Sequence, residues 1–449
     1  MCVFRLTGTL AISETTLKDV MLMLIEDLNA SGGLLGRNVS AVVKDPASNW
    51  PLFADMAREL VEDEGVDVVF GCWTSVSRKS VLPVFEALNS LLFYPVQYEG
   101  EEASRNVFYT GAAPNQQAIP AVDYLYSAAG GSIRRFALVG TDYVYPRTTN
   151  TILESYLQDA LGIPKEDILI SWSPFGQSGW ELITDEILAF AAGTDGSGPK
   201  PTAVVSTING DANIGFYAEL ARKGISASTL PVIAFSVGEE ELSSFSSEIR
   251  SALVGHYAAW NYFQSMSNSL NDVFIARWDE FTGNTGRVTN DPMEAHYIGF
   301  NMWVQAVKQA GTTNVDAVRQ AMYGQTVRSL SGYNISMGTN HHLSKPVIVG
   351  RIRADGQFDV VEQTSLTVDA VPWSPYFPGN GPNLVADWSY PYVCGRCYAN
   401  AASAASAAAS AASEASEASE ASDRASEAST APVSDRASEA SQASIVPNL

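Results

Sequence analysis

Cysteine and basic residues are scarce in this chain. It has four cysteines in 449 residues, too few for a disulfide framework. Cys394 and Cys397 form a single CxxC motif, for which a redox pair, half a zinc site and a small disulfide stay open, with a structural role favoured. Lys and Arg number 27 against 49 Asp and Glu, a formal net charge of −22. Nucleic acids and anionic membrane surfaces need a basic patch, so neither is an expected partner.

Long apolar runs are also absent. No stretch approaches the roughly 20 apolar residues of a membrane span, so we expect no insertion into a membrane. The first residues, MCVFRLTGTLAISE, lack the basic start, apolar segment and small-residue cleavage site of a secretory signal. They are typical of a first strand that begins almost at once. This start favours a cytosolic protein, or one whose sequence is a mature or truncated form.

Catalytic and phosphate-binding motifs are missing as well. The glycine-rich residues 193–198 precede a proline rather than a helix, and residues 176–179 do not form the GxSxG motif of hydrolases. The adjacent His341 and His342 point apart on an extended segment, which favours a surface loop over a metal site. We therefore expect no catalytic residue, no metal and no cofactor, and we expect a protein that is not an enzyme.

Strand and helix patterns alternate along most of the chain. After an expected strand at 3–9, apolar residues spaced as on one helix face follow: Leu17, Val20, Met21, Leu24, Ile25 and Leu28. Further short strands are expected at 39–43, 66–71, 91–94, 136–140, 168–172, 203–207, 231–235 and 253–262, mostly separated by helices. Residues 345–353 and 358–361 predict a late hairpin. About ten such repeats exceed one comfortable sheet and predict two α/β lobes with a cleft between them.

The last segment differs from the rest. Residues 401–449 are rich in Ala, Ser and Glu and repeat with a period of three. That period drifts around a helix of 3.6 residues per turn and makes no steady apolar stripe. Since Ala and Ser bury little surface, the pattern predicts a disordered, low-complexity tail.

Polar and aromatic side chains gather where the predicted strands end. They are Trp73, Thr74 and Ser75, then Gln97 and Tyr98, then Thr141, Asp142, Tyr143 and Tyr145, then Asn209 and Asp211, and finally Ser236 and Glu239. In open α/β sheets small ligands bind outside the carboxyl ends of strands. Aromatic faces with hydroxyl and amide groups suit a small neutral polar molecule, and few basic side chains are near enough for a phosphate.

Several long segments carry a more specific signal. They are FGCWTSVSRKSVLPVFE, FYPVQYEGEE, YTGAAPNQQAIPA, GTDYVYPRTTN, STINGDAN, FSVGEEEL and VTNDPMEAHYIGFNMW. Over about residues 8–394 the chain resembles the urea-type substrate-binding proteins of bacterial ABC transporters. Their broader family includes the leucine/isoleucine/valine-binding proteins and a cytosolic amide sensor.

This resemblance implies the type I periplasmic-binding-protein fold, in which two doubly wound lobes are joined by three crossings and close like a hinge. Lobe one would hold residues 1–118 and 257–340, and lobe two residues 119–256 and 341–387. Residues 388–400 would form an extension that contains the CxxC motif, ahead of the tail at 401–449.

The resemblance also implies site residues, one by one. Trp73 and Ser75 match an aromatic ring and a serine of the amide-binding branch, with Thr74 between them, although the amide sensor has Tyr at the first position. Tyr94 is kept, whereas Val96 stands where the sensor has Thr, and Gln97 is expected to supply the lost hydrogen bond. The opposite lobe would supply Tyr143, Tyr145, Thr207, Ile208, Ser236 and Glu239.

The implied function is the capture of urea or a short-chain amide in the interlobe cleft, for delivery to ABC transporter permease subunits. Family resemblance then implies a periplasmic location. The alternative is an intracellular amide or urea sensor of the same fold that signals to a regulatory partner protein. The absence of a recognisable signal favours the sensor, and the closer match to the urea-binding branch favours the transporter component.

Overall fold

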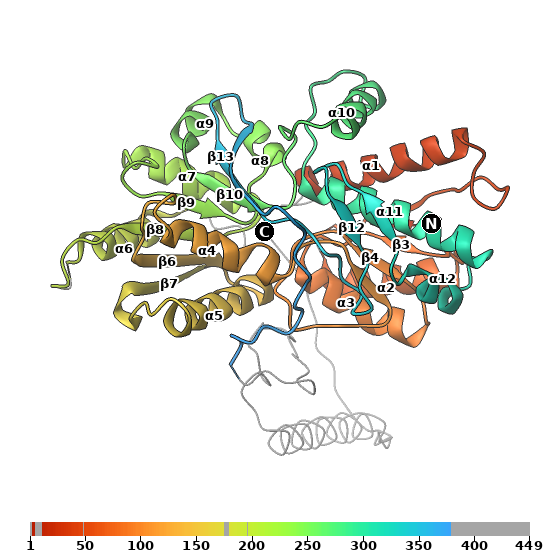
Figure 1. The fold of residues 1–449 in the computed structure, drawn as a ribbon, viewed down its shortest axis with the longest axis horizontal. Helices are drawn as coiled ribbons and strands as arrows, with labels where there is room; N and C mark the ends of the chain where they lie inside the picture. The colour runs from red at the N-terminus through yellow and green to blue at the C-terminus, as the bar shows by residue number, and fades with distance from the viewer. Residues whose placement is uncertain (1, 5–10, 48, 175–178, 195, 379–449) are drawn as a thin grey trace, which may run out of the picture. The chain divides into compact units, whose positions relative to one another are not determined.

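A computed structural model describes residues 2–4, 11–47, 49–174, 179–194 and 196–378, and these form two main β-sheets with helices on their faces (Figure 1). A two-stranded ribbon, β11 (Thr326–Arg328) with β12 (Asn334–Ser336), accompanies them. The predicted CxxC extension at 388–400 and the predicted tail at 401–449 lie outside the described residues. The predicted α/β class is confirmed.

The first sheet has five parallel strands, and we call it with its helices lobe one. Its order is β2 (Val42–Lys44), β1 (Cys2–Phe4), β3 (Val69–Phe70), β4 (Leu92–Tyr94) and β5 (Val107–Tyr109). Helix α1 (Ala11–Ala30) packs against α11 (Asp291–Ala310), which also packs against α12 (Val315–Met322), and α2 (Trp50–Glu62) packs against α3 (Ser75–Ala87). Helix α10 (Ser269–Phe281) contacts α1.

The second sheet has seven strands, and we call it with its helices lobe two. Strands β7 (Ile168–Ser173), β6 (Arg135–Thr141), β8 (Thr202–Thr207), β9 (Val232–Ala234) and β10 (Tyr257–Trp260) run parallel, and β13 (Ile348–Ile352) and β14 (Phe358–Gln363) add an antiparallel edge. The predicted late hairpin is therefore confirmed.

Both faces of this second sheet are covered, because successive side chains of a strand point to opposite faces. From β6, Phe136 and Leu138 join a core with α4 (Ala118–Tyr126) and α5 (Val144–Asp159). Ala137 and Val139 join the core on the other side, with α6 (Glu181–Ala192), α7 (Ala212–Arg222), α8 (Glu239–Ser244) and α9 (Ser247–Leu253). Figure 1 shows α4 and α5 on one side of β6 and β7.

Three segments connect the two sheets: residues 110–117, which include the short 3-10 helix η1 (Pro114–Gln116), residues 261–268 and residues 337–347. Asn261 links all three of them. Its Nδ2 donates hydrogen bonds to the carbonyls of Gln116 at 3.0 Å and Pro346 at 2.6 Å. Its backbone N–H donates to Asp291 at the start of α11. A single buried amide therefore fixes the three crossings relative to one another.

The second crossing corrects two expectations. The predicted strand at 253–262 is only β10, because Ser246 caps α9 through Ile249 N–H and the helix continues to Leu253. The resemblance places residues 257–340 in lobe one, but β10 pairs with β9 and β13 in lobe two. The chain therefore leaves the second sheet only after Trp260. The rest of the division between lobes stays a prediction.

The expected surface loop at His341 and His342 is wrong. Both rings are buried, and they stack on neighbouring aromatic residues, His341 on Phe108 and His342 on Tyr109, each at 4.4 Å between centroids. Burial lowers the pKa of both imidazoles to about 4. In the part of the chain that the structure describes, no group of three or more His, Cys, Asp and Glu could hold a metal ion. The described helices also include none that is long and apolar enough to cross a bilayer.

Candidate ligand-binding site

A tight turn between β3 and α3 positions the first candidate residues. Cys72 has a φ of 64°, in the left-handed region, and turns the chain sharply after the strand. Thr74 then caps α3, since its Oγ1 accepts a hydrogen bond from Ser77 N–H at 3.1 Å. The role that the structure gives Thr74 is therefore to hold the helix end and the turn in place.

Trp73 and Tyr94 join the ends of two neighbouring strands. The Tyr94 hydroxyl donates to the Trp73 carbonyl at 2.7 Å, and both side chains are buried. Burial raises the pKa of Tyr94 far above neutral, so the hydroxyl stays protonated and remains a donor. The pair forms a rigid aromatic corner in lobe one.

Ser75 contacts a buried ion pair. Its Oγ donates to Glu99 Oε2, and Arg78 Nη1 lies 3.3 Å from the same Oγ. Arg78 also donates from Nη2 to Glu99 Oε1 at 2.8 Å, and both charged side chains are fully buried. The hydroxyl of Ser75 is therefore oriented by Arg78 and Glu99.

The charges around Arg78 balance. Its Nε donates to Glu102 at 2.7 Å, and Lys79 donates to the same carboxylate at 2.6 Å. Burial opposes ionisation, but Arg78 and Lys79 hold the pKa of Glu102 well below its usual range. The rings of Tyr94 and Tyr98 lie 4.6 and 4.8 Å from the guanidinium carbon. Two cations thus face two carboxylates, which leaves no uncompensated positive charge in this group.

Gln97 crosses from lobe one to lobe two. Its Nε2 donates to the Phe235 carbonyl at 2.7 Å and lies 3.2 Å from Ser236 Oγ. Ser236 in turn donates to Asn209 Oδ1 at 2.8 Å. Gln97 Oε1 is buried and has no hydrogen-bond partner among the described residues. One side-chain amide thus joins the lobes and keeps an acceptor unused.

Tyr143 and Tyr145 face the same region from lobe two. Both are buried, and with Val144 they pack against Val76 of α3. Burial raises the pKa of Tyr145, and the side chains of Gln97 and Ser236 lie close enough to oppose that rise. Within the described structure the Tyr145 hydroxyl makes no hydrogen bond. An unused acceptor and an unused hydroxyl therefore lie near each other between the lobes.

Thr207 and Ile208 lie one layer behind these residues. Thr207 Oγ1 lies 3.2 Å from Asn150 Oδ1, and Ile208 belongs to the apolar core under α7. Asn209 Nδ2 donates to the Thr207 carbonyl at 3.0 Å while its Oδ1 accepts from Ser236. Thr207 therefore supports Asn209, which in turn holds Ser236.

Glu239 and Val96 also lie away from the contact between lobes. Glu239 Oε1 accepts from Gln264 N–H at 2.7 Å, which places the carboxyl at the second crossing. Burial raises its pKa to about 8. Val96 is buried in the apolar core of lobe one. The contacts of both side chains therefore stabilise the fold.

The structure thus brings seven of the twelve candidate residues into two neighbouring groups: Trp73, Ser75 and Tyr94 in lobe one, and Gln97, Tyr143, Tyr145 and Ser236 at the contact between lobes. The candidate list lacks Arg78, Glu99 and Asn209, which orient members of these groups. Asn209 is visible in the sequence as a polar residue at a strand end. Arg78 lies one helical turn after Thr74, a spacing that could have placed it beneath the turn.

Comparison with protein families shows one match over most of the chain. The model described as periplasmic binding protein domain matches residues 2–379.

Solved structures of solute-binding proteins are also similar. One from Rhodopseudomonas palustris HaA2, in complex with p-hydroxybenzoic acid, has a TM-score of 0.69 at 16% identity and covers 82% of this chain and 96% of its own. A leucine-binding protein from Thermotoga maritima has a TM-score of 0.65 at 16% identity, with 81% and 97% covered. At these identities the likeness concerns the fold, and it confirms the predicted type I periplasmic-binding-protein fold.

A curated relative matches a smaller part. It is named limonene hydroxylase, from Geobacillus stearothermophilus, and is 33% identical over 118 residues, which are 26% of this chain. The chain spans only 21% of the length of that protein. The name limonene hydroxylase therefore applies to that protein and is not carried over to this chain.

Proposed function

We propose that this chain, which belongs to the periplasmic binding protein domain family, is the substrate-binding component of an ABC transporter and captures urea or a short-chain amide between its lobes. The family and the solved relatives are solute-binding proteins, so the prediction that the chain is not an enzyme is confirmed. The observation that carries the proposal is the Gln97 contact with Phe235 and Ser236, which leaves a buried acceptor between the lobes.

The charge balance of the site supports a neutral ligand. One of the solved relatives named above is a complex with p-hydroxybenzoic acid, and the other is a leucine-binding protein. Both of these molecules carry a carboxylate. In this chain Arg78 and Lys79 are paired with Glu99 and Glu102, and Arg147 beside the tyrosines pairs with Asp142 at 2.5 Å. Burying a carboxylate without a free cation is costly. An uncharged amide avoids that cost.

The unused polar atoms match the groups of urea. Urea carries one carbonyl acceptor and two NH2 donor groups. Gln97 Oε1 would accept from an NH2 group, and the Tyr145 hydroxyl would donate to the carbonyl. Trp73, Tyr94 and Tyr143 would enclose the flat molecule with aromatic faces. A site that hydrogen-bonds its ligand in this way rejects analogues that lack a partner.

Capture would depend on lobe closure. The proposed ligand contacts come from Gln97 in lobe one and Tyr145 in lobe two, so all of them form only when the lobes are together. A ligand that binds the closed state better shifts the population toward it. In the proposed role, the closed form presents the ligand to permease subunits at the periplasmic side of the membrane.

Calorimetric titration of the full chain tests the proposal. We expect saturable heat with urea, and comparison with acetamide, formamide, leucine and benzoate sets the specificity. Trp73→Ala should weaken urea binding about tenfold or more, whereas Trp73→Tyr, which keeps a ring, should retain most of it. Thermal melting of both variants separates a lost pocket wall from a lost fold. Saturable binding of leucine or benzoate at the interlobe site without urea binding would overturn the amide assignment.

A further inference from the structure

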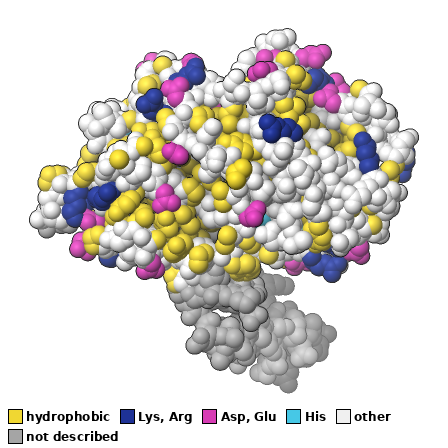
Figure 2. Space-filling model, viewed as in Figure 1, with side chains coloured by type: hydrophobic (Ala, Val, Ile, Leu, Met, Phe, Trp, Pro, Cys, Tyr) yellow, Lys and Arg dark blue, Asp and Glu magenta, His cyan; other side chains and the backbone are white. Residues whose placement is uncertain are grey.

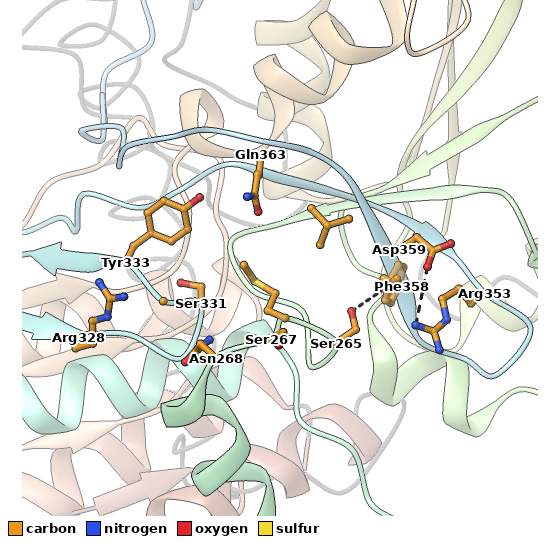
Figure 3. A pocket seen from close by; sticks show the side chains of 13 residues that line it. Ser265, Ser267, Asn268, Arg328, Ser331, Tyr333, Arg353, Phe358, Asp359 and Gln363 are labelled. Atoms are coloured by element: carbon orange, nitrogen blue, oxygen red, sulfur yellow. Dashed lines mark hydrogen bonds and ion pairs between the residues drawn. The ribbon is translucent and has the colours of Figure 1, made fainter.

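A cavity lies away from the interlobe residues described above. It has a volume of about 640 Å³ and is lined by the second crossing, by the ribbon of β11 and β12 with its connecting turn, and by the hairpin of β13 and β14 (Figure 3). Figure 3 shows Arg328 and Tyr333 on one side, and Phe358, Asp359 and Arg353 on the other. This volume is within the range of small-molecule sites.

The cavity contains an uncompensated cation. Arg328 is exposed, and its hydrogen bond from Nη1 to Asn334 Oδ1 is long, at 3.4 Å. Among the described residues no carboxylate lies within ion-pair distance of its guanidinium, whereas Arg353 across the cavity pairs with Asp355 and Asp359. On the face drawn in Figure 2, basic side chains are scattered among acidic and uncharged surface.

Apolar side chains form part of the same cavity. Phe358, Met266 and Val360 line it, and Val360 is 37% exposed. The polar lining is partly committed to the protein, since Ser265 donates to the Phe358 carbonyl at 2.6 Å and Tyr333 to the Thr364 carbonyl at 2.5 Å. The cavity thus offers a cation on one side and, among polar groups, an apolar surface at Met266 and Val360.

We propose that this cavity is a second binding site, which takes a small organic carboxylate with an apolar body. The carboxylate would bind the Arg328 guanidinium, whose fork matches its two oxygens. The body would cover Met266 and Val360 and remove their apolar surface from water. This ligand class is the opposite of the neutral amide proposed for the interlobe site, so the two sites can be separated by charge alone.

The test uses benzoate and its neutral counterpart benzamide, titrated calorimetrically into the full chain. We expect benzoate to bind and benzamide to bind at least tenfold more weakly, since only the charged form pairs with Arg328. Arg328→Gln should weaken benzoate binding to a similar extent. Arg58→Gln removes another exposed arginine, on α2, and should leave benzoate binding unchanged. Gln97→Ala, in the interlobe site, should also leave it unchanged.

Three outcomes would overturn the proposal. The first is benzoate binding that survives Arg328→Gln but is lost in Gln97→Ala, which would assign the carboxylate to the interlobe site. The second is equal losses in the Arg328 and Arg58 variants, which would indicate a general charge effect. The third is the absence of saturable benzoate binding to folded protein. None of these outcomes depends on whether urea binds, so this proposal and the urea assignment can fail separately.

Discussion

At the scale of single residues, Gln97 combines two properties that the sequence reveals only in part. Its position after β4 follows from the rule that ligands bind at strand ends, and it is predictable. Its partner Phe235 lies 138 residues away, and local periodicity contains no information on such a contact. The same limit explains His341 and His342. The sequence predicts that their two side chains point in opposite directions. It does not predict that the rings of Phe108 and Tyr109 cover them.

Replacement of Gln97 tests its double role. In Gln97→Ala the contact between lobes and the unused acceptor are both removed, so we expect urea affinity to fall by roughly tenfold to a hundredfold. Gln320→Ala is the matched control, because that amide is exposed on α12 and lies outside the site. Calorimetry of both variants gives the comparison. Unchanged affinity in Gln97→Ala would remove the residue from the binding site.

At the scale of elements, the alternation of strands and helices was predictable, but one strand and one strand boundary were not. Strand β8, Thr202–Thr207, lies where the pattern places it, at 203–207, because its apolar run is clear. Strand β5, Val107–Tyr109, was not among the expected strands. The apolar run before β10 suggested a strand from 253, but the Ser246 cap had already begun α9. The Ser246 N-cap therefore outweighed the preference of the apolar run for a strand.

The crossings also depend on a contact that no local pattern indicates, the amide of Asn261. Asn261→Ala removes its donors and leaves the buried carbonyls of Gln116 and Pro346 without this partner. We expect the free energy of unfolding to fall by about 2–4 kcal/mol. The control Asn334→Ala, at an exposed site in the ribbon, should cost about 0.5 kcal/mol or less. Guanidinium unfolding of the two variants gives both values, and equal losses would contradict a special role for Asn261.

At the scale of the whole molecule, two sets of buried ionisable groups shift in opposite directions. Burial raises the pKa of four glutamates to about 7 or 8: Glu101, Glu239, Glu240 and Glu294. Burial also lowers the pKa of all four histidines to about 3 or 4: His256, His296, His341 and His342. Composition gives the number of such groups, but only the fold determines which are buried. The pH dependence of stability therefore could not be predicted from sequence.

The sign of that dependence is clear between pH 6.5 and 8.5. The histidines oppose this dependence only at the lower end of the window, because their ordinary pKa is 6.5 and folding lowers it: the unfolded imidazoles are half protonated at pH 6.5 and lose those protons as the pH rises. The glutamates are ionised when unfolded, with a pKa near 4.5, but bind protons in the folded state up to pH 7 or 8. The folded state thus holds more protons, and stability must fall as the pH rises through these folded pKa values.

We expect the melting temperature to fall across this window, with a loss of stability on the order of 1–3 kcal/mol. Glu239→Gln should flatten the profile most clearly near pH 8, because Gln cannot ionise and Glu239 has the highest folded pKa of the four. Glu166→Gln, at an exposed position, removes the same formal charge and should keep the original slope. Melting curves in buffers of constant ionic strength give the three profiles. A melting temperature that rises from pH 6.5 to 8.5 would mean that these carboxyls are ionised in the folded protein, with unrecognised partners for their charge.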